Sequence, residues 1–172
     1  KGNPSSPIGS PVFLCANKGD FIIQYGHRTE KEVPMSGEGK VVVITGAGQG
    51  IGEATARVFG ERGATLILLD KNRKTLPGVA KRLEEEGVTV YPYIIDLTRT
   101  KELEALIEDV KGKWDVDVLI NNAGFDRPGV SAKTGRTDFT AVLGIHLTVP
   151  FLLSKWLLPP MRRKRWGRIV NI

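Results

Sequence analysis

A glycine-rich segment at 45–52 has the residue types and the spacing of a phosphate-binding turn. It reads Thr-Gly-Ala-Gly-Gln-Gly-Ile-Gly, follows the β-branched run 41–44 and precedes a helical pattern. Glycine lets the backbone turn tightly and approach a ligand where a Cβ would clash. The N-terminus of the following helix offers unpaired N–H groups and a partial positive charge to an anion. We therefore predict a dinucleotide site at this turn, with a plain strand-to-helix turn as the alternative.

Asp70 is a further residue whose type and position suggest contact with a ligand. It follows the apolar run 65–69 and lies eighteen positions after Gly52, near the spacing at which a carboxylate accepts hydrogen bonds from an adenosine ribose. A carboxylate there repels a 2′-phosphate and so favours NAD over NADP, although Lys71 and Arg73 beside it weaken this preference. The alternative is a solvated loop acid without a ligand.

Polar residues also follow the next two apolar runs. Asp96 is expected either to accept from an adenine amino group or to cap the next helix, a role that Thr98 or Thr100 could also fill. Asn-Asn-Ala-Gly at 121–124 brings side chains that both donate and accept hydrogen bonds. These amides are expected either to tie neighbouring strands together or to contact the ligand.

A regular alternation of strands and helices from residue 40 onwards must position these groups. Near-continuous apolar runs predict strands at 41–45, 65–69, 88–95, 116–120 and 168–172. Helical patterns lie between them, at 50–62, 73–86, 100–112 and 138–164. We predict an α/β fold, a doubly wound parallel sheet of Rossmann type that is truncated after its fifth strand. Such sheets bind ligands at the carboxyl ends of their strands, where the polar residues above lie.

The length of the chain fits one domain with an N-terminal extension. We divide the 172 residues into a poorly defined extension at 1–39 and an incomplete dinucleotide-binding domain at 40–172. Short strands are expected within the extension at 12–14 and 21–25. The single cysteine, Cys15, excludes an internal disulfide and agrees with a cytoplasmic protein.

The net charge and the apolar runs of the chain indicate whether nucleic acid or a membrane could be a partner. The formal net charge is +6, and much of the excess lies in a basic cluster that comprises Arg162, Arg163, Lys164, Arg165 and Arg168. We interpret this basic cluster as cations that suit a helix C-terminus. The alternative is a nucleic-acid surface that uses Trp156 and Trp166 for stacking. No apolar run approaches the roughly 18 residues that span a bilayer, and we expect no nucleic-acid, membrane or metal partner.

Together these motifs resemble those of the short-chain dehydrogenases/reductases, most closely the 3-oxoacyl-[acyl-carrier-protein] reductase type. The resemblance covers 40–172 and adds Gly-Arg-Ile-Val-Asn-Ile at 167–172 to the motifs above. It implies that NAD, with NADP less favoured, is the cofactor. The implied cofactor-binding residues are Thr45, Gly46, Gln49, Gly50, Ile51 and Gly52 near the pyrophosphate, Asp70 at the adenosine ribose, Asp96 and Leu97 at the adenine, and Asn121, Ala123 and Gly124 near the nicotinamide ribose.

The chain departs from the family pattern in its catalytic residues. Family enzymes use a Ser, a Tyr and a Lys that lie downstream of the strand expected at 168–172, and no Tyr-x-x-x-Lys occurs in this sequence. We therefore predict that the chain alone is inactive. His146 stands where the family has an Asn that supports a proton relay, and His could also relay protons. The alternative is a histidine tolerated in a helix without a catalytic task.

Two functions from different classes remain. The first is an NAD(P)-dependent oxidoreductase that interconverts a secondary alcohol and a ketone, with 3-oxoacyl thioester reduction as its leading specific form. The second is a non-catalytic dinucleotide-binding or interaction module. For the first function the partners would be a small alcohol or ketone and further copies of the same protein.

Overall fold

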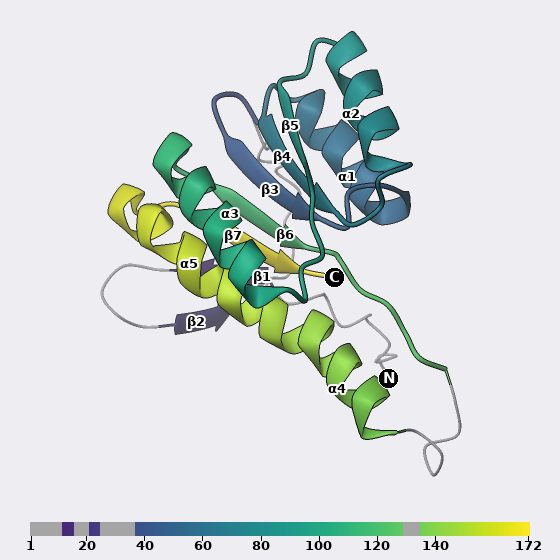
Figure 1. Ribbon diagram of the computed structural model, residues 1–172. Helices are drawn as coiled ribbons and strands as arrows, with labels where there is room; N and C mark the ends of the chain where they lie inside the picture. Colours follow the sequence, from purple (N-terminus) through teal and green to yellow (C-terminus); the bar gives the residue numbers. More distant parts are fainter. Residues whose placement is uncertain (1–11, 16–20, 25–36, 129–134) are drawn as a thin grey trace, which may run out of the picture.

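The computed structural model describes residues 12–15, 21–24, 37–128 and 135–172. Strands and helices alternate along the described part of the domain, as the sequence predicts (Figure 1). They run in the order β3 (Val41–Thr45), α1 (Gly50–Gly60), β4 (Thr65–Asp70), α2 (Leu76–Glu85), β5 (Val90–Ile94), α3 (Thr100–Lys113), β6 (Val118–Asn121), α4 (Arg136–Leu143), the π-helical turn η2 (Gly144–Thr148), α5 (Val149–Lys164) and β7 (Arg168–Asn171).

The five strands β3 to β7 form one parallel sheet in the spatial order β5-β4-β3-β6-β7. The chain winds outward from β3 to β5, returns to β6 beside β3, and then continues to β7. Helices α1 and α2 cover one face of the sheet, and α3 and α5 cover the other (Figure 1). The predicted doubly wound α/β fold is therefore confirmed. Because the connections after β3 and β6 leave toward opposite faces, a crevice is expected between the ends of these two strands.

Alternate residues of the strands supply two separate cores, because successive side chains of a strand point to opposite faces. Val42 and Ile44 pack with the α1–α2 layer, whereas Val43 packs with the α3–α5 layer. In β4, Leu68 belongs to the first core and Ile67 to the second. Both faces of the central strands are buried, which explains why these strands appear as near-continuous apolar runs.

Helices α4 and α5 join through η2 into one continuous helix of 29 residues, Arg136–Lys164. Its inner face carries Ile145, Val149, Leu153, Leu157 and Met161, which belong to the core. An 18-residue window of this helix has a mean hydropathy of 1.6, and 22% of the window is buried. By length and composition alone the helix could therefore cross a membrane.

No uninterrupted apolar run marks this helix in the sequence, because residues such as His146 and Lys155 break it. In the fold, one side of the helix packs on the sheet as a core helix does. That no membrane partner exists stays a prediction.

The start of α2 and the end of α1, at Gly60 instead of residue 62, differ from the sequence prediction for local reasons. Helix α2 begins at Leu76 rather than at residue 73, because the Asn72 side-chain oxygen accepts the backbone N–H of Lys74 at 2.9 Å and of Thr75 at 3.3 Å. These bonds hold a turn in place of the first helical residues. The chain leaves the end of α1 through Gly63, whose φ of +80° suits glycine.

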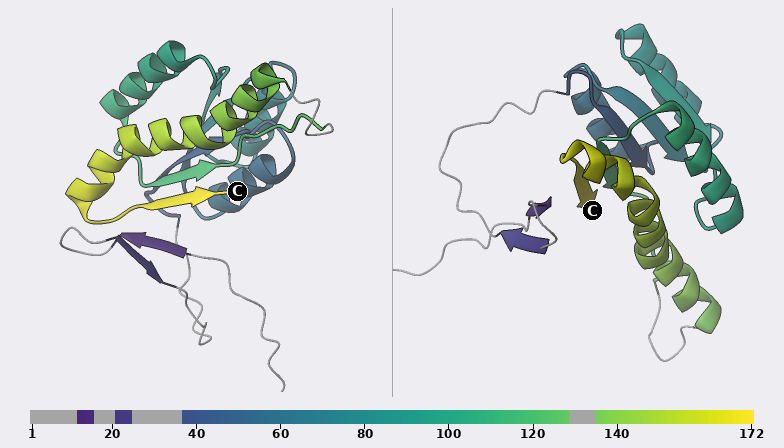
Figure 2. Two further views of the ribbon diagram at one scale, coloured as in Figure 1. Left: turned by 90° about the horizontal axis from the view of Figure 1, so that it is seen from below. Right: turned by 90° about the vertical axis from the view of Figure 1, so that its left-hand side faces the viewer.

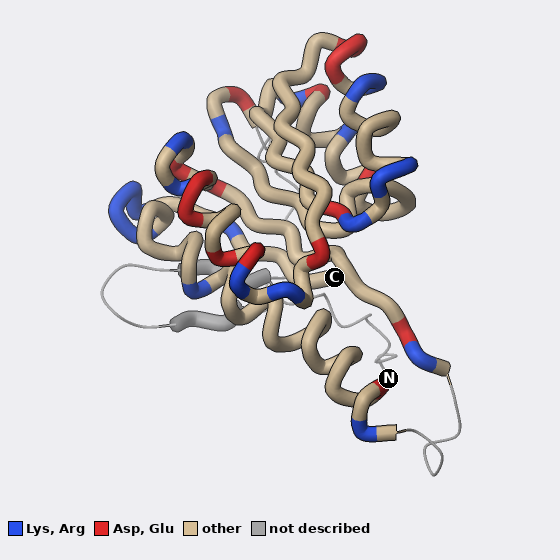
Figure 3. The backbone as a smooth tube through the Cα atoms, in the orientation of Figure 1, with Lys and Arg blue, Asp and Glu red and all other residues tan. Residues whose placement is uncertain are grey.

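The basic cluster lies at the end of α5 and the start of β7 (Figure 3), and two of its members, Arg163 and Lys164, fasten the end of α5 to the segment before β6. Lys164 Nζ lies 2.6 Å from the Asp117 carboxylate and also donates to the Asp115 carbonyl oxygen at 2.8 Å, while Arg163 pairs with the Asp115 carboxylate at 3.0 Å. The second Asp117 oxygen accepts the backbone N–H of Val41 at 3.0 Å. These contacts support the interpretation of the basic cluster as part of a helix C-terminus, and nucleic-acid binding stays untested.

Outside the main sheet, β1 (Val12–Cys15) and β2 (Phe21–Gln24) form an antiparallel pair. The two short strands expected in the extension are therefore present. Strand β1 lies near β7, the last strand of the main sheet (Figure 2). The division of the chain at residue 39 into extension and domain stays a prediction.

Replacement of Asp117 by Ala is expected to destabilise the domain by about 3 kcal/mol, because it leaves the Lys164 ammonium and the Val41 N–H without their buried partner. Glu108→Ala, which breaks the exposed Lys111–Glu108 pair, is the matched control and should cost less than about 1 kcal/mol. Urea unfolding followed by circular dichroism measures both. Equal midpoints for the two variants would contradict this role of Asp117.

Candidate functional site

A cavity of about 360 Å³ lies at the carboxyl ends of the strands, beside the point where the chain connections diverge. Its wall comes from the segments that follow β3, β4, β5 and β6, together with one residue of η2. The lining residues are Gly46, Gln49, Gly50, Ile51, Asp70, Lys71, Asn72, Ile95, Asp96, Leu97, Thr98, Asn122, Ala123, Gly124, Phe125 and Ile145.

The glycine-rich turn brings uncapped helix backbone to this cavity. Gly46 and Gly50 have φ of +65° and +58°, a conformation that favours glycine. A Cβ on Gly50 would meet open space, whereas a Cβ on Gly52 would collide with the Gly46 carbonyl oxygen and the Asn122 amide. Helix α1 starts without a side-chain cap. Its first backbone N–H groups are therefore free of a capping side chain and can bind an anion.

Asp70 ties the glycine-rich turn to the end of β4. One carboxylate oxygen accepts the Gly48 N–H at 2.8 Å, and the other accepts the Asn72 N–H at 2.8 Å. A side chain at Gly48 would lie 2.9 Å from the Asp70 oxygen and 2.7 Å from the Thr75 hydroxyl, so glycine is required by this close approach. Asp70 lines the cavity as well and can present its remaining lone pairs to a ribose hydroxyl.

Asp96 forms a local turn, which corrects the expectation that it caps the next helix. Its carboxylate accepts the Thr98 hydroxyl at 2.7 Å and the Thr98 backbone N–H at 3.0 Å. The residue at the cap position of α3 is Arg99, without a side-chain capping bond, so Thr98 and Thr100 do not cap this helix either. The hydrogen bond from the Thr98 hydroxyl holds the pKa of Asp96 below its ordinary value, and the charge of Lys71 acts in the same direction. Asp96 is thus an ionised acceptor on the cavity wall.

Thr45 and Asn122 lock the ends of β3 and β6 together. The Thr45 hydroxyl accepts the backbone N–H groups of Asn122 and Ala123, both at 3.0 Å, and donates to the Ile120 carbonyl oxygen at 3.3 Å. The Asn122 amide donates to the carbonyl oxygens of Thr45 at 3.0 Å and Gly46 at 3.1 Å. The predicted tie between neighbouring strands is therefore confirmed.

Most of the predicted cofactor-binding residues meet at this one cavity, and their contact with a cofactor stays a prediction. Thr45, Gly52 and Asn121 lie behind the wall instead of on it. Thr45 is buried within the strand lock, and Gly52 packs against the Gly46 carbonyl. Asn121 is 5% exposed and donates to the Asn171 side chain at 2.8 Å, which joins β6 to β7. These three residues support the wall from behind.

Sequence reasoning did not single out several lining residues. Asn122 was included only as part of the Asn-Asn-Ala-Gly motif and Lys71 only as a charge beside Asp70, while Asn72 could have been found from its place directly after β4. The apolar members have no chemical signature in the sequence, and only the fold brings them to the cavity; they are Ile95, Phe125 and Ile145.

His146 lies just outside the cavity, in η2, and its side chain is exposed. Its Nε2 is 2.9 Å from the Phe125 carbonyl oxygen. The ring also lies against Gly124, where an added Cβ would be 2.5 Å from the His146 Cε1 atom. The structure thus places His146 against the cavity wall, and a catalytic task for it stays a prediction.

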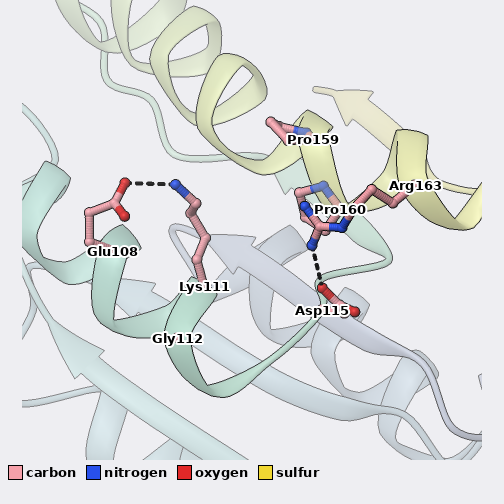
Figure 4. A pocket seen from close by; sticks show the side chains of 7 residues that line it. All are labelled: Glu108, Lys111, Gly112, Asp115, Pro159, Pro160 and Arg163. Carbon is pink, nitrogen blue, oxygen red and sulfur yellow. Dashed lines mark hydrogen bonds and ion pairs between the residues drawn. The ribbon is translucent and has the colours of Figure 1, made fainter.

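A second cleft, of about 430 Å³, lies between α3 and α5 at the other end of the sheet (Figure 4). Its charged side chains are already paired with one another, Lys111 with Glu108 at 2.7 Å and Arg163 with Asp115 at 3.0 Å. Pro159 and Pro160 supply part of its wall. Because its charges are compensated, this cleft is a weaker candidate for an ionic ligand than the strand-end cavity.

The residues of the strand-end cavity fit an adenine dinucleotide. The uncapped start of α1 and the open space at Gly50 suit a pyrophosphate. Asp70 and Asp96 supply acceptors for ribose hydroxyls and an adenine amino group. The exposed side chain of Ile51 and the buried Leu97 add apolar surface for flat rings.

Comparison with known proteins places these features in one family. A family model described as short chain dehydrogenase matches residues 40–172. The chain is 36% identical over 136 residues to the 3-oxoacyl-[acyl-carrier-protein] reductase FabG of Thermotoga maritima, which covers 78% of this chain and 55% of the relative. It is 33% identical to human 17-beta-hydroxysteroid dehydrogenase 13 over 78% of this chain and 45% of that protein.

Solved structures agree with the sequence relatives. A metagenomic short-chain oxidoreductase in complex with NADP superposes with a TM-score of 0.76 at 30% identity, over 79% of this chain and 62% of that chain. The resemblance inferred from the motifs, including the 3-oxoacyl-[acyl-carrier-protein] reductase type, is thereby confirmed. The chain spans about half the length of the curated relatives named above, 55% and 45% respectively.

Replacement of Thr45 by Val is expected to cost about 1–3 kcal/mol of stability, because two backbone N–H groups at the end of β6 lose their acceptor. Thr45→Ser keeps the hydroxyl and is the control, with an expected loss below about 1 kcal/mol. Thermal unfolding of both variants gives the difference. A Thr45→Val variant as stable as wild type, with the loss confined to Thr45→Ser, would show that the methyl group, and not the hydroxyl, carries the contribution of Thr45.

Proposed function

The chain belongs to the short chain dehydrogenases, and we propose that it forms the cofactor-binding part of an NAD(P)-dependent oxidoreductase that interconverts a secondary alcohol and a ketone. One observation carries the proposal: the uncapped start of α1 and the carboxylates Asp70 and Asp96 face one cavity at the switch point of the sheet. An anion site with two acceptors along the same wall matches the polar groups of an adenine dinucleotide.

The proposed roles of this chain's residues are to bind and orient the cofactor. The N–H groups at the start of α1 hold the pyrophosphate, Asp70 accepts from the adenosine ribose, and Asp96 accepts from the adenine amino group. Asn122 and Gly124, at the end of β6, border the nicotinamide half of the cavity. The bound nicotinamide would supply the hydride acceptor or donor for the reaction.

The substrate class we propose first is a 3-oxoacyl thioester. Support comes from the motif resemblance and from the relative named 3-oxoacyl-[acyl-carrier-protein] reductase. A second relative is named for a hydroxysteroid, so the same cofactor-binding frame occurs with chemically different alcohols.

We also propose that these 172 residues alone do not turn over substrate, since the sequence contains no Tyr-x-x-x-Lys. A non-catalytic dinucleotide-binding module is the second candidate, and the same observation favours it.

For the cofactor we propose NAD, with NADP as the competing choice. The Asp70 carboxylate lies on the cavity wall and would repel a 2′-phosphate. Lys71 next to it lines the same cavity and would attract that phosphate, and a neighbouring structure contains NADP. The balance between the two charges therefore decides the preference.

We expect the wild-type chain to bind NADH about tenfold more tightly than NADPH, which corresponds to about 1.4 kcal/mol. Asp70→Asn should remove most of this preference, chiefly by tighter binding of NADPH. Titration followed by nicotinamide fluorescence measures both affinities, and Glu104→Gln on the exposed side of α3 is the control. A folded wild-type chain that binds neither nucleotide would overturn the proposed function, and an unchanged preference in Asp70→Asn would overturn only the role of Asp70.

We further propose that copies of the protein associate through the outer face of the long helix. Phe139, Leu143, Leu147 and Phe151 are 58%, 40%, 64% and 62% exposed, although all four are large and apolar. They recur every four residues, opposite the inner face that packs on the sheet. The order Phe-Leu-Leu-Phe is the same from both ends. An antiparallel second copy therefore places each Phe opposite a Phe and each Leu opposite a Leu, as a two-fold interface requires.

Leu147→Glu is expected to weaken this self-association at least about tenfold, because it brings two charges into an apolar contact. Val58→Glu, at an exposed apolar residue of α1, is the matched control and should leave association unchanged. Sedimentation velocity over a concentration series measures both variants. A wild-type chain that remains monomeric at all concentrations, or that floats with lipid vesicles instead of pairing, would contradict the proposal.

A further inference from the structure

His146 occupies an interruption in an otherwise regular helix. The segment Gly144–Thr148 is a π-helical turn between α4 and α5, and such turns frequently mark functional sites. The widened turn places the imidazole against the segment that follows β6. Gly124 leaves the space that the ring fills, since a Cβ there would lie 2.5 Å from the His146 Cε1 atom and 3.1 Å from its Nε2.

The contact between His146 and Phe125 has a defined direction. The Phe125 carbonyl oxygen can only accept a hydrogen bond, so the Nε2 of His146, 2.9 Å away, must carry the proton and donate. Both the neutral ring with its proton on Nε2 and the charged ring satisfy this geometry. The side chain therefore acts as a donor that holds a backbone carbonyl in place.

Phe125 forms part of the cavity wall that this hydrogen bond holds. Its ring packs against the α3–α5 core. The Lys71 ammonium lies 5.5 Å from the ring centroid, and the Arg127 guanidinium lies 5.5 Å from it as well. Lys71 comes from the end of β4, so the Phe125 ring connects two strand ends across the rim of the cavity. A shift of the Phe125 backbone would move both this ring and Gly124.

We propose that His146 is a positioning residue that fixes the turn 122–125 as the wall of the cavity on its nicotinamide side. The inference rests on the proposed function for the identity of the ligand, and on the observed contacts for the positioning itself. His146 needs no proton transfer for this role. The Asp70 and Asp96 carboxylates lie after β4 and β5, and the hydrogen bonds that hold them come from Gly48, Asn72 and Thr98.

The test compares two variants that separate ring packing from hydrogen bonding. His146→Phe keeps an aromatic ring over Gly124 but removes the donor. His146→Gln places an amide nitrogen three bonds from Cβ, the same number as Nε2 of histidine, and so can restore the bond to the Phe125 carbonyl. Affinities for NADH and for AMP are measured on the full 172-residue chain, because AMP occupies only the adenosine half of the proposed site.

We expect His146→Phe to weaken NADH binding about three- to tenfold, the worth of one hydrogen bond, and to leave AMP binding unchanged. His146→Gln should restore NADH binding to within about twofold of wild type. Equal loss of both ligands in His146→Phe, or no loss of either, would overturn the positioning role, because general destabilisation affects both ends of the cavity.

Hydrogen exchange of the ligand-free chain provides a second measurement that needs no nucleotide. The backbone amides of 123–127 should exchange several-fold faster in His146→Phe than in wild type, with protection regained in His146→Gln. Unchanged exchange would overturn the inference. If the wild-type chain binds neither NADH nor AMP, the proposed function fails, and the exchange pattern still decides whether His146 holds the turn.

Discussion

The hydrogen-bonded lock between Thr45 and Asn122 is the constraint on which the cavity depends. Strands β3 and β6 are neighbours, yet the chain leaves them toward opposite faces of the sheet. The peptide groups that the two strand ends turn toward each other therefore lack a backbone partner in the opposite strand at the point of divergence. The Thr45 hydroxyl and the Asn122 amide satisfy those groups from within the fold, at 3.0–3.3 Å. The crevice can remain open because the backbone at its base does not need a ligand or water to satisfy it.

The glycines follow from the same lock. Once β3 and β6 are held at this separation, the turn after β3 must pass directly over the end of β6. A Cβ on Gly46 would lie 2.9 Å from the Ala123 Cα atom, and one on Gly52 would collide with the Asn122 amide. The glycine pattern is therefore a steric consequence of the strand lock as much as a device for binding phosphate.

Sequence alone predicted the elements and the rim of the cavity, because both follow from short-range rules. Apolar runs located the five strands of the parallel sheet, and the rule that ligands bind at carboxyl ends located Asp70, Asp96 and Gly124. The sequence could not show which of two adjacent residues faces the cavity and which faces the neighbouring strand. Of two consecutive asparagines, Asn121 points into the sheet toward Asn171, and Asn122 lies on the cavity. Successive side chains of a strand point in opposite directions. Which of the two asparagines points to which side is fixed only by the pairing of β6 with its neighbouring strands.

The π-helical turn escaped sequence analysis for a similar reason, and it links the two faces of the long helix. In a regular α-helix, residues spaced by four drift around the axis by about 40° at each step. A π turn takes more residues per turn, so the widened segment Gly144–Thr148, which follows Leu143 and contains Leu147, offsets part of that drift and keeps the exposed apolar residues on one side. The same insertion directs His146 toward the Phe125 carbonyl. One local widening of the helix therefore serves both the cavity wall and the outer apolar face, and a change that removes it would disturb both together.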